Sequence, residues 1–233
     1  MSQKNEDIKT RITTCFEGKV NFIESSCNEL IFELQCEDLI DVAKELKTNE
    51  NMMFEQLTDL CGVDYLTYGV DEWTTKSATS SGFSRGVSRQ SVILDDADTF
   101  DDKRFAVIYN LLSIKHNSRI RLRVYTGDKN PPIIPSVSSI WSSANWLERE
   151  TFDLYGILFE GHPDLRRILT DYGFVGHPFR KDFPLSGNVE IHYDEKKEKI
   201  VYKPVSIEPR TLVPRVIRQD NRYSDEIKDD NNG

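Results

Sequence analysis

The chain has 233 residues, a length that suits one domain with appendages or two small domains. Its 39 acidic residues against 30 basic residues give a formal net charge of −9, which argues against a general nucleic-acid binder, because binding to phosphates requires a positive field. No apolar run approaches the ~20 residues that span a bilayer. The N-terminal MSQKNEDIKTR has neither the apolar centre of a secretory signal nor the acid-poor composition of a mitochondrial transit peptide.

The first fifty residues predict helices on both sides of a β-hairpin. Residues 5–17 predict the first helix. The β-rich runs 20–25 and 29–35 are separated by turn residues, as in a hairpin. Residues 37–49 then show the apolar spacing of an amphipathic helix.

The four cysteines, Cys15, Cys27, Cys36 and Cys61, lie in the first part of the chain. No two of them form a C-x-x-C motif, and their spacing matches no zinc or iron–sulfur pattern. We therefore expect four reduced and mostly buried thiols, which indicates a cytosolic setting.

The next segment predicts a short helix, a strand and a long loop. NMMFEQLTDLCG (51–62) is expected to form a short helix that ends at Gly62, and VDYLTYG (63–69) is a strand candidate. Residues 71–102 are rich in serine and end in the acidic run DDADTFDD, which predicts a loop inserted within one domain.

Two strands follow, and the second carries a row of arginines. RFAVIYNLLSI (104–114) is apolar on both faces, as in a central strand, and KHNS forms the turn into RIRLRVY (119–125). In this second strand Arg119, Arg121 and Arg123 alternate with apolar residues. They predict either a solvated outer face paired with acids of a neighbouring strand or a docking stripe for an acidic partner.

A helix with one apolar stripe is predicted from an N-cap at Ser136 to about Tyr155. Glu148 falls inside this stripe. A carboxylate on a core face must find a cation or raise its pKa. Arg166 and Arg167 are the nearest candidate cations in the sequence.

The opposite face of this helix gathers Trp146, Arg149, Glu150 and Asp153. Arg149 and Asp153 have the i,i+4 spacing of an ion pair, with the basic residue first. Glu148 and Glu150 point about 200° apart on a helix, so they cannot flank one glycosidic bond as a catalytic pair.

The segment after the helix is a chain of turns that contains the sequence GHP twice. His162 and His177 suggest a metal site, but no third ligand stands at a suitable spacing, so we interpret them as structural residues in turns. RKD (180–182), between Phe179 and Phe183, is a weak candidate for a nucleic-acid patch. No G-x-S-x-G, G-x-G-x-x-G or phosphate-loop motif occurs in the sequence.

The C-terminal residues predict a hairpin followed by an extended arm. VEIHYD and KIVYKP, joined by EKKE (189–204), have the pattern of a hairpin. Pro204, Pro209 and Pro214 then interrupt an otherwise apolar segment, which excludes a helix. Such an arm either lies over a partner subunit or folds back on its own domain, and we favour the partner subunit.

These elements predict an α+β fold, in which a mixed or antiparallel sheet has flanking helices and is followed by an extended, proline-punctuated C-terminal arm. We expect an α+β domain over 1–135, with the inserted loop 71–102. A helix and a turn-rich segment over 136–188 would pack on the same domain. The hairpin and the extended C-terminal arm would occupy 189–233.

Three motifs stand close together in the C-terminal half: ERETFDLYGI (148–157), HPDLRRIL (162–169) and GHPFRKDFPL (176–185). Through them the chain resembles the 30 kDa-type (C-type) subunit of the proton-pumping NADH:quinone oxidoreductase, respiratory complex I. The resemblance is dense over 143–205 and looser over 30–70 and 104–125.

The resemblance implies an α+β domain in the hydrophilic arm of this complex, in which electrons pass from NADH through FMN and iron–sulfur clusters to ubiquinone, coupled to proton translocation. It implies no flavin, iron–sulfur cluster or metal, and no catalytic residue, in this subunit itself. The implied partners are chiefly the D-type subunit, which helps to form the quinone site, and the connecting iron–sulfur subunits. The implied location is the cytoplasmic face of the bacterial inner membrane, or the matrix side of the mitochondrial one, reached only through other subunits.

The resemblance favours an interface over an active site. The charged residues of the motifs would form a network that fixes the helix and its turns against neighbouring subunits. The alternatives are a related subunit of a membrane-bound hydrogenase, a free-standing enzyme that uses residues 148–182, and a nucleic-acid binder that uses the arginine row. The expected interface and structural residues are Glu148, Arg149, Glu150, Asp153, Gly156, His162, Pro163, Arg166, Arg167, His177, Arg180, Lys181 and Asp182.

Overall fold

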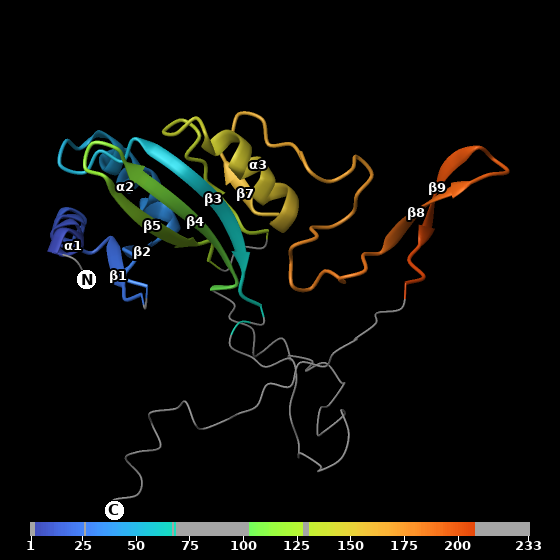
Figure 1. The fold of residues 1–233 in the computed structure, drawn as a ribbon, viewed down its shortest axis with the longest axis horizontal. Coiled ribbons are helices and arrows are strands. Elements are labelled where there is room, and N and C mark those ends of the chain that lie inside the picture. Colours follow the sequence, from blue (N-terminus) through green and yellow to red (C-terminus); the bar gives the residue numbers. More distant parts are fainter. Residues whose placement is uncertain (1–2, 26, 67, 69–102, 128–130, 208–233) are drawn as a thin grey trace, which may run out of the picture. The chain divides into compact units, whose positions relative to one another are not determined.

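The computed structural model describes residues 3–25, 27–66, 68, 103–127 and 131–207. The loop predicted over 71–102, and the arm predicted beyond residue 207, lie outside the described residues. The described part is an α+β fold with a mixed sheet, as predicted (Figure 1).

A five-stranded sheet is the centre of the fold. Strands β2 and β5 run parallel, and the other neighbouring strands run antiparallel. The predicted hairpin over 20–35, the interior position of β4 and the turn between β4 and β5 are confirmed. In spatial order the strands are β1 (Val20–Ile23), β2 (Ile31–Leu34), β5 (Ser118–Tyr125), β4 (Phe105–Ser113) and β3 (Gln56–Asp64).

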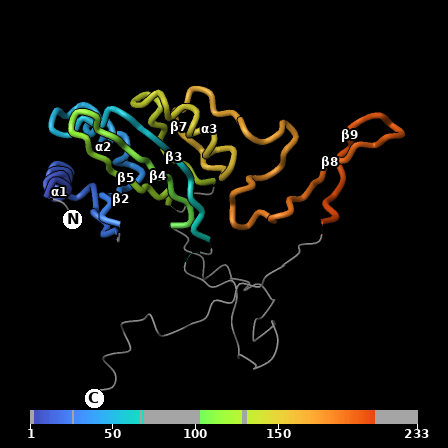
Figure 2. The backbone as a smooth tube through the Cα atoms, in the orientation of Figure 1, coloured from blue at the N-terminus to red at the C-terminus, as the bar shows by residue number. Residues whose placement is uncertain are grey.

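The helices bury their apolar sides against one hydrophobic core. The 3₁₀ turn η1 (Cys36–Asp38) leads into α2, whose buried residues share one helical face. Figure 2 shows α2 behind the sheet and α3 beside β3. None of the helices in the described ranges is long and apolar enough to cross a membrane. Their bounds are α1 (Gln3–Cys15), α2 (Leu39–Thr48) and α3 (Ala144–Tyr155).

Two short ladders complete the described elements. Strands β6 (Ile133–Pro135) and β7 (Leu158–Glu160) flank α3 in the sequence and pair in parallel. Strands β8 (Val189–Asp194) and β9 (Lys199–Pro204) pair antiparallel, which confirms the predicted C-terminal hairpin.

The prediction of a short helix over 51–62 is wrong, because most of this segment belongs to strand β3. A register shift between Leu57 and Asp59 in the pairing with β4 lets Leu57 and Leu60 both lie buried, although they are three residues apart. That spacing imitates the apolar repeat of a helix. Of the strand candidate 63–69, only the first two residues belong to β3.

The helix predicted from Ser136 begins only at Ala144. The residues between them form turns, in which the N–H groups of Ile140 and Trp141 both donate to the Val137 carbonyl. These three apolar side chains are buried at helical spacing, which explains why the sequence extends the helix backwards.

The expectation of mostly buried thiols is wrong. Cys15, Cys27 and Cys61 are exposed, and Cys36 is half-buried. Cys61 lies on β3 between the buried Leu60 and Gly62, so it faces away from the core.

Candidate functional site

The acidic cluster of the sequence lies on α3, and most of it is buried. Glu148 and Asp153 have no exposed surface, and Arg149 is 9% exposed. The sequence placed Arg149 and Asp153 on a face opposite the core, but the turns after β7 cover this face and bind both side chains. The cluster is therefore a set of internal anchors.

Glu148 is held by the turn that precedes α3, and neither expected arginine is its partner. The Ser136 hydroxyl donates to Glu148 Oε2 at 2.6 Å, and the Val137 N–H donates to Oε1 at 2.7 Å. Burial raises the pKa of Glu148 to about 7, although both hydrogen bonds favour the ionised form. Of the two outcomes that the sequence allowed, the raised pKa is realised, while Arg166 and Arg167 bind elsewhere.

Asp153 organises the turn that follows β7. Its Oδ2 accepts hydrogen bonds from the N–H groups of residues 168–170, at distances between 2.8 and 3.1 Å. Its Oδ1 accepts from the Thr170 hydroxyl at 2.5 Å and from Arg167 Nη1 at 3.3 Å. Burial favours the neutral carboxyl, but the hydrogen bonds from this turn outweigh burial and lower the pKa of Asp153. The cation that binds Asp153 is therefore Arg167, and not Arg149 as the sequence predicted.

The second GHP motif covers the C-terminal end of α3. Gly156 ends the helix in the left-handed conformation, with φ +73°. His177 Nδ1 lies 2.9 Å from the Asp153 carbonyl oxygen, and Arg180 Nε donates to the Tyr155 carbonyl at 2.6 Å. Both side chains thus bind carbonyl groups in the last turn of α3, where helical partners run out.

A second anchor, centred on Asp64, joins β3 to the RKD segment. The buried Asp64 carboxylate accepts hydrogen bonds from Arg104 Nε and Nη2, each at 3.2 Å, and from the Lys181 N–H at 2.8 Å. Arg104 Nη2 also donates to Asp182 Oδ2 at 2.7 Å. Asp64 and Arg104 were not predicted as site residues from the sequence. The sequence signal that could have identified them is an acid at the buried end of strand β3, followed by an arginine directly before strand β4.

The remaining arginines of the motifs make local contacts. Arg149 Nε donates to the Arg166 carbonyl at 3.1 Å, and its guanidinium carbon lies 4.9 Å from the centre of the Trp146 ring. Arg166 forms an exposed ion pair with Asp164 at 2.6 Å. Within the described residues the motifs therefore form several separate anchors, and the network that would fix them against neighbouring subunits stays a prediction.

His162 holds the first GHP turn. Its Nε2 lies 3.1 Å from the Asn145 carbonyl oxygen, and the Asp164 N–H donates to its Nδ1 at 3.0 Å. Pro163 is exposed, and Glu150 is half-buried without an ion pair to another described residue. Across the described ranges, no three His, Cys, Asp or Glu side chains gather as metal ligands.

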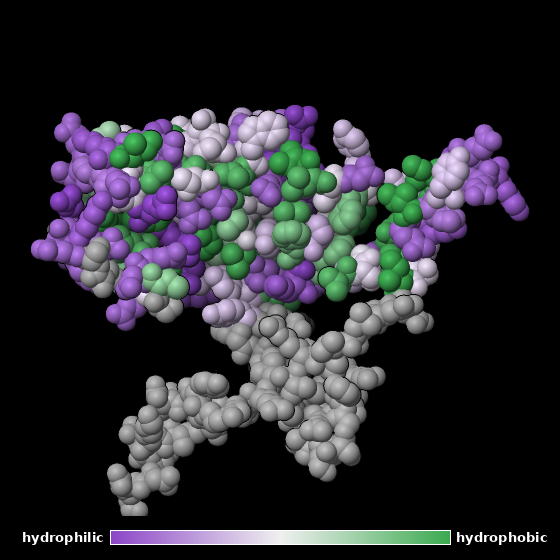
Figure 3. Space-filling model, viewed as in Figure 1, coloured by the Kyte–Doolittle hydropathy of each residue, from purple (hydrophilic) through white to green (hydrophobic). Residues whose placement is uncertain are grey.

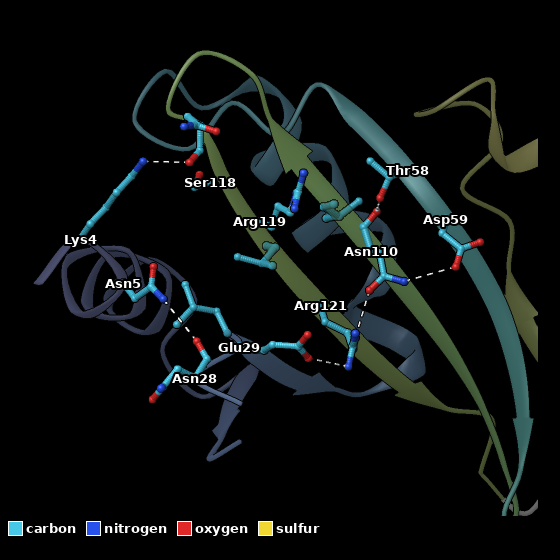
Figure 4. Close-up of a pocket in the computed structure, with 14 residues that line it drawn as sticks. Lys4, Asn5, Asn28, Glu29, Thr58, Asp59, Asn110, Ser118, Arg119 and Arg121 are labelled. Carbon is cyan, nitrogen blue, oxygen red and sulfur yellow. Dashed lines mark hydrogen bonds and ion pairs between the residues drawn. The ribbon is translucent and has the colours of Figure 1, made fainter. Parts of the chain in front are cut away.

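A polar groove of about 700 Å³ lies on the sheet face that carries the arginine row (Figure 4). Arg121 binds Glu29 at 2.8 Å and Asn110 at 3.0 Å within it, while Arg119 is exposed. Arg123, further along the same face, binds Glu33 at 2.8 Å. Two of the three arginines are therefore paired with acids of the same chain, as in the charge-paired outer face that the sequence allowed, while the docking stripe stays a prediction.

The C-terminal hairpin presents an exposed apolar face. The register places Ile191 opposite Tyr202, and Tyr193 opposite Ile200, so these four side chains lie on one face. Their exposed fractions are 60%, 58%, 56% and 61%. Figure 3 shows apolar residues gathered on this hairpin. Exposed apolar side chains clustered in this way mark an interaction surface.

Comparisons with known proteins converge on one family. The family model "Respiratory-chain NADH dehydrogenase, 30 Kd subunit" matches residues 32–189. The C-type subunit of the NADH-quinone oxidoreductase of Legionella pneumophila is 52% identical over 220 residues, which cover 94% of this chain and 95% of that protein. Its counterparts from Halorhodospira halophila and Coxiella burnetii, which have the same name, are 51% and 53% identical. These matches cover 94% and 89% of this chain, and 93% and 90% of the relatives.

Proposed function

Since this chain belongs to the family of the 30 kDa subunit of the respiratory-chain NADH dehydrogenase, we propose that its task in NADH–quinone oxidoreductase is structural. It holds subunits of the peripheral arm of complex I together and supports their assembly. Electron transfer from NADH through FMN and iron–sulfur clusters to quinone, coupled to proton translocation, takes place on other subunits.

The exposed apolar face of the β8–β9 hairpin is the observation that carries this proposal. An isolated two-stranded hairpin is marginally stable in water, so a hairpin with this apolar face gains stability when another surface covers it. Tyrosine is enriched at protein–protein interfaces, and the buried centre of an interface is more apolar than its polar rim. The chain is therefore built to be completed by a protein partner.

The anchors around α3 support the same proposal from within the chain. Asp153 and Asp64 direct their hydrogen bonds to the turns after β7 and to the RKD segment. These acids shape a segment that has few regular elements of its own, and that leads directly into the hairpin. The anchors thus fix where the hairpin leaves the α+β domain.

We assign the covering partner to the D-type, quinone-site subunit, together with the connecting iron–sulfur subunits. An apolar face of isoleucine and tyrosine suits a protein surface better than a nucleic acid, which calls for cationic contacts to phosphate. In this proposal the chain lies on the cytoplasmic face of the bacterial inner membrane and reaches the membrane only through other subunits.

The proposal is tested by removing apolar side chains from one face of the hairpin. Ile191→Ser and Tyr202→Ser are introduced together in the full complex, and gently solubilised membranes are run on a native gel stained for NADH oxidation. We expect less of the large NADH-oxidising band, with normal turnover per assembled complex. His192→Ser, on the opposite face of the same strand, is the matched control and leaves the band unchanged.

Two results contradict the proposal. One is a normal amount of assembled complex with poor turnover, which indicates a part in the reaction itself. The other is migration of the wild-type chain as a single protein of its own mass. That result would favour a free-standing enzyme with residues 148–182 as its active site.

A further inference from the structure

The Glu148 carboxyl group is buried, and no lysine or arginine of the described residues forms an ion pair with it. The closest basic group is His162, whose Nε2 lies 3.8 Å from Glu148 Oε2. Because His162 Nδ1 accepts the Asp164 N–H, this nitrogen carries no proton, and the ring proton on Nε2 faces the Asn145 carbonyl. The Nε2 atom of His162 is thus directed to a backbone carbonyl group at 3.1 Å and lies farther from Glu148.

Tyr109 and Cys36 are further titratable groups in this region. Tyr109 of β4 is fully buried, and its hydroxyl makes no hydrogen bond to the described residues. Burial, and then the nearby Glu148, raise the pKa of Tyr109 well above its ordinary value. Cys36 of η1, which lies close to Tyr109, donates to the Ile133 carbonyl at 3.7 Å. The hydrogen bonds that stabilise an ionised Glu148 come from the neutral Ser136 hydroxyl and the Val137 N–H.

A chain of hydroxyl groups leads away from this carboxyl group. The Glu148 Oε2 atom lies 2.6 Å from Ser136 Oγ, and Ser136 Oγ lies 2.8 Å from Ser138 Oγ. Glu148 is fully buried, Ser136 is 7% exposed, and Ser138 is half-buried. The hydroxyl chain therefore runs from the interior towards the surface.

This chain can satisfy both protonation states of Glu148 without moving a heavy atom. When Glu148 is ionised, the Ser138 hydroxyl donates to Ser136, and the Ser136 hydroxyl donates to the carboxylate. When Glu148 is protonated, both hydroxyls rotate, so that Glu148 donates to Ser136 and Ser136 donates to Ser138. The Val137 N–H remains bound to the other carboxyl oxygen in both states.

We infer that Glu148 is an internal proton-binding site that exchanges its proton with solvent through the hydroxyl groups of Ser136 and Ser138. On release, the proton of Glu148 Oε2 passes to Ser136 Oγ as the Ser136 proton passes to Ser138 Oγ. The Ser138 proton then passes to a water molecule at the surface. Uptake is the reverse sequence, and no heavy-atom bond breaks in either direction.

The test follows the side-chain carboxyl carbon of Glu148 by NMR in the full chain, labelled with ¹³C-glutamate, from about pH 5 to about pH 9. The Glu148→Gln variant identifies the resonance. We expect one titration with a midpoint near pH 7, well separated from the ordinary glutamates. A Glu148 resonance that stays at its ionised position across this range overturns the inference.

Two serine variants test the hydroxyl route, and Ser139→Ala is the matched control. Ser136→Ala removes the O–H donor of the ionised form, so the midpoint rises by about one pH unit or more. Ser138→Ala leaves the carboxyl contact intact but interrupts the route, so exchange slows and the resonance broadens or splits at the midpoint. Ser139 is exposed and outside the chain of hydroxyls, so its variant titrates as the wild type does. An unchanged midpoint in Ser136→Ala, or an unchanged line width in Ser138→Ala, contradicts the route.

Discussion

Glu148 links the stability of the chain to pH in the direction opposite to most carboxylates. Its pKa rises from an ordinary value of 4.5 to about 7 on folding, so the folded state holds the proton more tightly. Its favourable contribution is complete below the unfolded pKa and is lost as pH rises through the folded pKa. The difference corresponds to about 3 kcal/mol of unfolding free energy.

The Glu148→Gln variant removes this dependence, because its neutral amide does not titrate. Urea unfolding at about pH 5 and about pH 8 therefore gives a larger loss of stability for the wild type than for the variant. An identical pH dependence in the two proteins contradicts the buried, unpaired state of Glu148.

Gly156 is required both by its backbone conformation and by its neighbours. Its φ is +73°, and an added Cβ would lie 2.6 Å from the His177 ring and 2.9 Å from Arg180 Nη2. We expect Gly156→Ala to lower the free energy of unfolding by about 3 kcal/mol, since left-handed strain and overpacking add. Gly161 has φ +81° with nothing within 4 Å, so Gly161→Ala loses only about 1 kcal/mol. Equal losses in a urea titration would show that His177 and Arg180 do not pack there.

At the scale of elements, regular periodicity made most of the fold predictable. Strict alternation identified β5, and apolar spacing identified α2, because each buries one face against the same core. Strand β3 was not predicted, because the register shift after Leu57 gives its buried apolar residues the spacing of a helix. The first residue of α3 was predicted too early, because the buried turns before the helix continue its apolar stripe.

The anchors of α3 were harder to predict than the helix itself. The motifs identified residues that form the anchors, but not the partners of these residues. Ser136 binds Glu148, and Asp64 binds the Lys181 N–H, only because the folded chain brings them together. Arg167 binds Asp153 in place of Arg149 because the turn after β7 brings it there, while Arg149 binds the Arg166 carbonyl. Sequence spacing along a helix carries no information about such a turn.

The anchor at Asp64 ties β3 and β4 to the RKD segment, and its loss is measurable. Arg104→Ala leaves Asp64 buried without its cation, which lowers the free energy of unfolding by about 3 kcal/mol. Lys103→Ala is the adjacent control, because Lys103 is exposed and its contact with Glu33 is 3.5 Å, so its loss is below about 1 kcal/mol. Chemical denaturation of both variants gives the comparison. Similar losses of unfolding free energy would show that Arg104 and Asp64 do not form a stabilising anchor.

For the whole molecule, internal anchors and an exposed hairpin predict defects of assembly, and not of turnover. Arg149 is nearly buried and supports the Arg166 backbone, so Arg149→Ala weakens the turns that lead to the hairpin. We expect Arg149→Ala or Glu148→Ala to reduce the amount of assembled complex, while turnover per assembled complex stays normal. Quantitative native gels with activity staining provide both values. Full assembly with reduced turnover would place these residues in the reaction pathway.

In the assembled complex we expect other subunits to cover the apolar face of the β8–β9 hairpin. Hydrogen–deuterium exchange of the amides of residues 189–204, compared between the purified chain and the assembled complex, tests this most directly. We expect fast exchange in the purified chain and strong protection in the complex, with amides of β4 protected in both. Equal exchange of the hairpin in the two states would contradict this expectation.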